Sequence, residues 1–228
     1  MNHLNKNLFY PCSGEDFYVP IQKCWNDVEH FWFVDPRYDG GPEAFAPLDV
    51  KKIMRRFLRR MNCEFVASSQ VTLTGLTRKG KRPYTVQQMS YVIRSRSKNS
   101  PQERTVHFCR GLGFNALLSI FDQTDRTLDI FYYRGDSSGE GGSGFYWLDW
   151  RLSSVLNRLN PDGFIFSDGS NARSYFKFKR DGSVPTAFVY KKWRIEPVFE
   201  RSHGRRLSRQ GQEVMGTTMC WRIKRFAE

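Results

Sequence analysis

The sequence predicts an α/β fold with three layers: a mostly parallel sheet between helices, antiparallel C-terminal edge strands and a basic hairpin insertion. Two observations predict this class. Strand-like and helix-like segments alternate along the chain, which favours a parallel sheet. The runs 30–34 and 128–133 are apolar at nearly every position, which is typical of strands buried on both faces.

The first fifth of the chain contains two strands and a short helix. Residues 8–10 form a short strand, and the residues 11–16 that follow have the composition of a turn. Pro20 suits the first turn of a short helix because its missing N–H is not needed there. The apolar run 30–34 is the second strand, and it ends at Asp35.

The clearest helix of the sequence covers residues 50–61, with Asp49 as its N-cap. Its apolar residues recur at the helical spacing: Val50, Ile53, Met54, Phe57, Leu58 and Met61. Its other face is basic throughout: Lys51, Lys52, Arg55, Arg56, Arg59 and Arg60. Six like charges repel one another along a helix, which favours an anionic partner such as nucleic acid. A solvated surface face is the alternative.

The middle of the chain has strand-like alternation at 64–74 and 84–96, joined by a basic turn. We therefore predict a basic hairpin insertion over 76–104. The elements expected after it are a strand at 105–109, a helix at 114–121, a strand at 128–133, a helix at 147–159 and a short strand at 164–166. The last two strands, at 186–198 and 217–226, form an antiparallel edge of the sheet.

The composition predicts one globular domain, residues 1–228, in the cytoplasm. With 39% hydrophobic and 15% aromatic residues, the chain can build a packed core. It has no apolar run of about 18 residues and no apolar signal-peptide core, so we expect no membrane partner. The five cysteines are widely spaced, with no Cys-x-x-Cys and no histidine at ligand spacing, so reduced thiols and no metal site are expected.

The net charge of +13 predicts an anionic partner, either a nucleic acid or an acidic protein. The charge is concentrated in residues 51–110, where basic side chains far outnumber acidic ones. A second basic segment in the tail contains Arg205 and Arg206 near Trp193 and Trp221. Aromatic rings among arginines can stack bases and pair phosphates. Solvated edge strands with the tryptophans in the core are the alternative.

A glycine turn and an acid are spaced as in a nucleotide-binding unit. Gly14 follows the first strand, and Asp35 closes the second. In such units an acid about 20 residues after the glycine turn hydrogen-bonds the ribose hydroxyls. A carboxylate suits that task because it can accept from both hydroxyls. A strand-end acid that caps a turn is the alternative for Asp35.

In its first strand and turn, the acid closing its second strand, and its antiparallel last pair, the chain resembles the class I S-adenosylmethionine-dependent methyltransferases. The resemblance spans most of the chain and implies a Rossmann-like fold. It also implies an S-adenosylmethionine cofactor held by Ser13, Gly14 and Asp35. The turn Pro11-Cys-Ser-Gly14 has one glycine, and Arg134-Gly-Asp136-Ser stands where many members carry an Asp/Asn-Pro-Pro-aromatic motif.

The loop 134–144 is the third candidate site, with five glycines in ten residues. Glycine-rich backbone can surround an anion or close as a lid, and Asp136 and Glu140 are the candidate catalytic acid and base. A surface loop is the alternative. Hydrolysis by Asp136, Glu140 and Asp168 around a divalent metal is a further possibility.

Two functions from different classes follow. The first is a methyltransferase-like enzyme that acts on or binds a nucleic acid or another anionic partner. The second is a catalytically silent protein of the same fold, an adaptor or inhibitor that engages nucleic acid or an acidic protein through its basic surface. The acidic strand ends favour the first function. The single glycine and the absent Pro-Pro motif favour the second.

Overall fold

The computed structural model describes residues 6–11, 13–40, 46–76, 83–96, 101–122, 126–134, 149–168, 176, 186–203 and 218–226. The four α-helices of these residues are α1 (Tyr18–Cys24), α2 (Val50–Met61), α3 (Gly113–Asp122) and α4 (Asp149–Arg158). The strands are β1 (Asn7–Tyr10), β2 (His30–Val34), β3 (Cys63–Leu76), β4 (Pro83–Ser95), β5 (Glu103–Arg110), β6 (Leu128–Tyr133), β7 (Leu159–Ser167), β8 (Phe188–Tyr190), β9 (Trp193–His203) and β10 (Thr218–Arg225).

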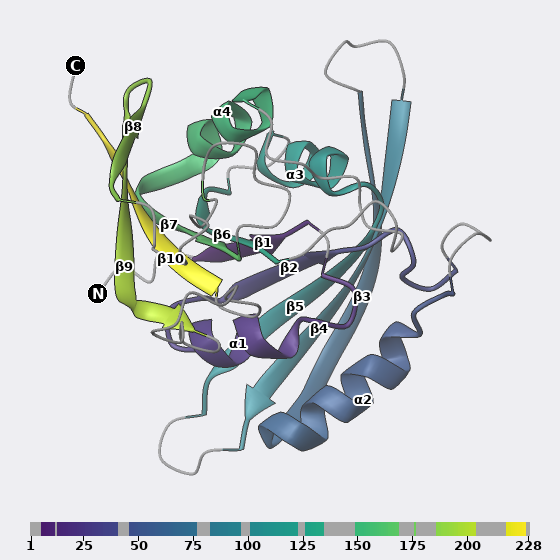
Figure 1. Ribbon diagram of the computed structural model, residues 1–228. Coiled ribbons are helices and arrows are strands. Elements are labelled where there is room, and N and C mark those ends of the chain that lie inside the picture. The colour runs from purple at the N-terminus through teal and green to yellow at the C-terminus, as the bar shows by residue number, and fades with distance from the viewer. Residues whose placement is uncertain are drawn as a thin grey trace.

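These strands form one ten-stranded mixed sheet in the order β3-β4-β5-β2-β1-β6-β7-β10-β9-β8 (Figure 1). The five central strands, from β5 to β7, pair in parallel. The strands at both ends pair antiparallel. The centre of the sheet therefore brings the carboxyl ends of five strands to one edge, where ligands of open α/β sheets usually bind.

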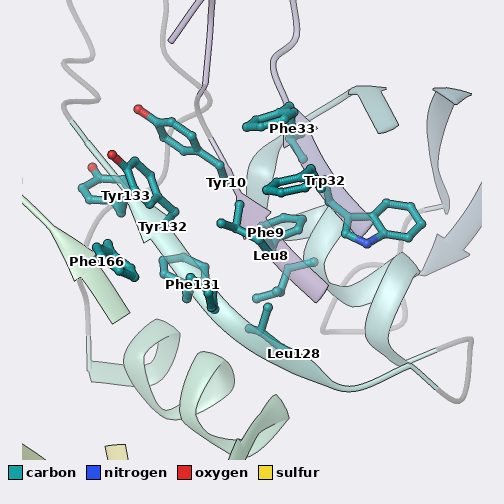
Figure 2. Close-up of a cluster of buried hydrophobic side chains, with 14 of the residues drawn as sticks. Leu8, Phe9, Tyr10, Trp32, Phe33, Leu128, Phe131, Tyr132, Tyr133 and Phe166 are labelled. Carbon is teal, nitrogen blue, oxygen red and sulfur yellow. The ribbon is translucent and has the colours of Figure 1, made fainter. Parts of the chain in front are cut away.

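The central strands are buried on both faces, as their continuous apolar sequences predict. β1 carries Phe9 and Tyr10, which pack against rings of β2 and β6, and Tyr132 of β6 in turn stacks on Phe166 of β7 (Figure 2). The ring hydroxyls of Tyr10, Tyr132 and Tyr133 lie at the same end of this cluster.

Each face of the sheet's centre has its own helix contacts. Phe17, before α1, and Phe57 of α2 pack on each other, and Phe17 also contacts Phe108 of β5. Phe121 of α3 packs edge-to-face on Phe9 and Trp32 from the other side. Figure 1 shows α1 and α2 on one side of the sheet and α3 and α4 on the other.

The predicted fold class, a three-layer Rossmann-like α/β fold with a mostly parallel sheet, is wrong. The described residues are mostly strand, and five of the nine strand pairings are antiparallel. Four helices are too few to cover a sheet of ten strands. In β3 every residue from 65 to 72 is exposed, so none of the described helices covers that stretch of the strand.

The predicted hairpin exists, but its second strand belongs to the sheet. β3 pairs with β4 over its whole length, and β4 pairs antiparallel with β5. Much of the segment expected as an insertion over 76–104 therefore widens the sheet. The predicted strand 186–198 is also wrong, because the chain turns at Lys191, whose φ of 52° is left-handed, and forms the β8–β9 hairpin.

The described helices include none that is long and apolar enough to cross a membrane. Cys24, Cys63, Cys109 and Cys220 are buried free thiols, which confirms that prediction for these four residues. Cys12 lies outside the described residues.

Candidate nucleic-acid interface

Helix α2 forms where the sequence predicts it, with both ends capped. The Asp49 side chain accepts a hydrogen bond from the backbone N–H of Lys52 at 2.9 Å, and Asp49 itself has an extended backbone. At the other end Asn62 takes a left-handed conformation with φ 51°, and its N–H bonds the carbonyl of Leu58. Such caps satisfy backbone groups that a helix end leaves without partners.

The apolar stripe of α2 is buried, so its basic residues face solvent. Val50, Ile53, Met54 and Phe57 are buried. All six basic side chains of the other face are exposed: Lys51, Lys52, Arg55, Arg56, Arg59 and Arg60. None of the six forms an ion pair with any residue that the structure describes. Their charges are therefore available to an anionic partner.

A cavity of about 200 Å³ lies between this helix and the β1–α1 turn. Tyr18 contributes an aromatic wall, and the Cζ atom of Arg60 lies 3.8 Å from the centre of its ring. Phe57 packs edge-to-face on the same ring. The remaining lining residues are Glu15, Phe17, Ile53 and Arg56. Tyr18 was not among the predicted site residues, because in a sequence an aromatic residue at the start of a helix usually indicates a core position.

The structure brings Ser13, Gly14 and Asp35 together at the carboxyl ends of β1 and β2. The N–H of Gly14 donates to Oδ2 of Asp35 at 3.1 Å. The Ser13 and Tyr38 hydroxyls are 2.6 Å apart, and the Tyr38 hydroxyl also donates to the Gly14 carbonyl at 2.7 Å. The juxtaposition implied by the family resemblance is therefore present.

The carboxylate of Asp35, however, already accepts hydrogen bonds from protein groups. Asp35 as a residue is only 1% exposed, and Arg37 donates to its carboxylate from its backbone N–H and from two guanidinium nitrogens, at 2.9–3.1 Å. This hydrogen bonding raises the pKa of Arg37. A Cβ atom on Gly14 would lie 2.8 Å from Nη2 of Arg37, so the arginine fills the space above the turn.

The residues as arranged do not fit a ribose. Both oxygens of Asp35 already accept hydrogen bonds, and Gly14 uses its N–H on the same carboxylate. A carboxylate that binds a ribose must face the ligand, and Asp35 is buried. Asp35 instead resembles the alternative given by the sequence, a strand-end acid that fixes a turn.

A second polar cluster lies at the same edge of the sheet, between the first turn and the end of β6. Asp16 forms an ion pair with Arg134 at 3.3 Å, and the Tyr10 hydroxyl lies 3.3 Å from Asp16 and 3.0 Å from the Arg134 carbonyl. Burial raises the pKa of Asp16, although Arg134 opposes the shift. Arg134 is the first residue of the predicted loop 134–144, and the rest of that loop lies outside the described residues.

Four predicted site residues lie outside the described residues: Asp136, Glu140, Arg205 and Arg206. Within the described part of the chain, no group of three or more histidine, cysteine or acidic side chains could hold a metal ion. Trp193 and Trp221 are buried, which agrees with the tail alternative that puts them in the core.

The half-buried His30 and the buried His107 form a polar cluster that the sequence did not reveal. Nδ1 of His30 and Nε2 of His107 are 3.1 Å apart, and Nδ1 of His107 is 2.8 Å from the Ser90 hydroxyl. The Trp32 ring stacks on His107 at 3.7 Å. Burial lowers the pKa of His30 to about 4 and holds that of His107 well below its usual range. Partners from three strands make this cluster, so no local spacing could predict it.

Comparison with known proteins does not identify a family for this chain. No family model, no curated protein and no solved structure matches the chain significantly.

Proposed function

We propose that this protein binds nucleic acid through the exposed basic face of α2. One observation carries the proposal: six basic side chains project from one helix whose apolar stripe is buried, and none pairs with a described acid. Phosphate groups that pair with such residues release condensed counterions, which supplies most of the affinity of non-specific nucleic-acid binding.

An acidic protein is the other partner that the net charge allows. The regular arrangement of α2 favours nucleic acid. Residues four apart on a helix are about 6 Å apart along its axis, so Lys52, Arg56 and Arg60 form one row and Lys51, Arg55 and Arg59 another. Two parallel rows of cations suit a polymer with regularly repeated phosphates.

We do not extend the proposal to methyl transfer. S-adenosylmethionine binding stays a prediction of the family resemblance. It is not favoured by this arrangement, because the carboxylate of Asp35 already accepts hydrogen bonds from Gly14 and Arg37. The supported function is that of a binding protein, which corresponds to the catalytically silent alternative. The free thiols of the described cysteines suit a reducing compartment, and we place the interaction in the cytoplasm.

Charge reversal tests the proposal. Replacing Arg55, Arg56, Arg59 and Arg60 with glutamate should abolish binding of a labelled duplex and a labelled single strand, measured by fluorescence anisotropy. The matched control reverses four basic residues at the other end of the sheet: Lys191, Lys192, Arg194 and Arg225. If both variants weaken binding equally, total charge and not α2 determines affinity, and the proposal is wrong.

A further inference from the structure

We infer that the cavity beside α2 takes one unpaired base, so that the nucleic acid bound there is single-stranded. The inference rests on the proposed function and adds the class of ligand. It is carried by the composition of the cavity, which combines an aromatic ring, two arginines and one carboxylate in about 200 Å³.

The aromatic part of the cavity suits a stacked base. Phe17, Ile53 and Phe57 are nearly fully buried and form the apolar base of the cavity, while Tyr18 is only half-buried. Phe57 fixes the Tyr18 ring through an edge-to-face contact, with ring centres 6.3 Å apart. A half-exposed ring held in place by a buried one loses little conformational freedom when a base stacks on it.

The charged part of the cavity suits the backbone on either side of that base. Arg56 and Arg60 are exposed, and they belong to the row of cations nearer the cavity. The guanidinium of Arg60 covers one face of the Tyr18 ring, with its Cζ atom 3.8 Å from the ring centre, so a base that stacks on this face takes the place of the arginine. Phosphates flanking the base would therefore meet two arginines that are free of acidic partners.

Glu15 gives the cavity a means of choosing between bases. It is the one carboxylate among the lining residues, and it is exposed. An ionised carboxylate only accepts hydrogen bonds, so it favours bases that carry an exocyclic amino group, such as cytosine. Thymine has no such group, and its one ring N–H on that edge lies between two carbonyl oxygens that repel a carboxylate. Single strands of cytosine should therefore bind more tightly than strands of thymine.

A duplex cannot use this cavity, because its bases are stacked and paired inside the double helix. Binding an unpaired base requires a strand whose bases can turn outward, as in single-stranded recognition. The basic face of α2 alone would bind a duplex at least as tightly as a single strand, because a duplex has the higher density of phosphates. A preference for single strands is therefore the property that separates the cavity from the charged face.

Fluorescence anisotropy with oligo-dC, oligo-dT and a duplex of equal length tests the inference on the full chain. The wild type should prefer single strands, and oligo-dC over oligo-dT. Tyr18→Ala should weaken single-strand binding about 5- to 150-fold and leave duplex binding unchanged. Glu15→Gln should remove the preference for oligo-dC. The control is Phe199→Ala, an exposed aromatic residue of β9 at the other end of the sheet.

A measurement on the unmutated protein covers the case in which Tyr18→Ala fails to fold. A strand containing 2-aminopurine should change its fluorescence on binding, because stacking on the tyrosine ring quenches it. Equal affinity for duplex and single strand, together with no change in 2-aminopurine fluorescence, would show that the cavity does not bind a base. Nucleic-acid binding by the charged face of α2 would not be affected by that result. The absence of salt-sensitive binding to any of the three nucleic acids would remove the proposed function as well.

Discussion

Replacing Asp35 with alanine should lower the stability of the protein strongly. The Asp35 side chain is 2% exposed and that of Arg37 is 25% exposed, and the carboxylate accepts four hydrogen bonds from Gly14 and Arg37. Breaking a buried pair leaves one charge without compensation and costs about 3–5 kcal/mol. Because Arg37 can still reach water, we expect about 3 kcal/mol, and in a chain of this length that lowers Tm by about 6–12 °C.

Urea and thermal unfolding measure the loss, and Asp122→Ala is the matched control. Asp122 also pairs with an arginine through two hydrogen bonds, but its side chain is 45% exposed. Exposed pairs contribute about 0–1 kcal/mol, so this variant should unfold close to the wild type. If Asp35→Ala costs no more than Asp122→Ala, Asp35 does not fix the turn, and a ligand-binding role for its carboxylate becomes the better explanation.

Three further predictions follow from the structure. Gly163→Ala should cost about 1–3 kcal/mol in unfolding experiments, because the new Cβ would lie 2.6 Å from Cγ of Leu159 and 2.9 and 3.0 Å from two backbone oxygens. Asp49→Ala should cost about 1 kcal/mol through loss of the α2 cap, detectable as a lower urea midpoint. The free energy of unfolding should fall as pH drops from about 6.5 towards 4, because the unfolded chain protonates histidines that burial keeps neutral in the fold; His107→Gln should flatten this dependence.

The sequence predicted those parts of the fold that depend on local pattern. Helix α2 and its cap at Asp49 follow from the spacing of apolar residues and from capping chemistry, and both are present. The runs around Phe33 and Phe131 are buried parallel strands, as their continuous apolar sequence indicates. In each case, neighbouring residues contain the information.

The fold class could not be predicted because it depends on which distant strands pair. The hairpin of β3 and β4 alternates in polarity whether it projects from the sheet or extends it, and only the pairing of β4 with β5 decides. The same reason applies to Asp35. Its spacing from Gly14 suits a ribose-binding acid, but Arg37, two residues later, occupies the carboxylate instead. The spacing alone did not show that competition.

The salt dependence of binding tests the central claim, that the basic face of α2 contacts phosphates. The measurement compares the wild type with the variant in which Arg55, Arg56, Arg59 and Arg60 are alanine, using one labelled single strand over a range of salt concentrations. Each phosphate contact contributes about 0.7–0.9 to the slope of log affinity against log salt. We expect the slope of the variant to be lower by about 3, and its circular dichroism spectrum to match that of the wild type. Equal slopes would contradict it, because the four arginines would then contact no phosphate.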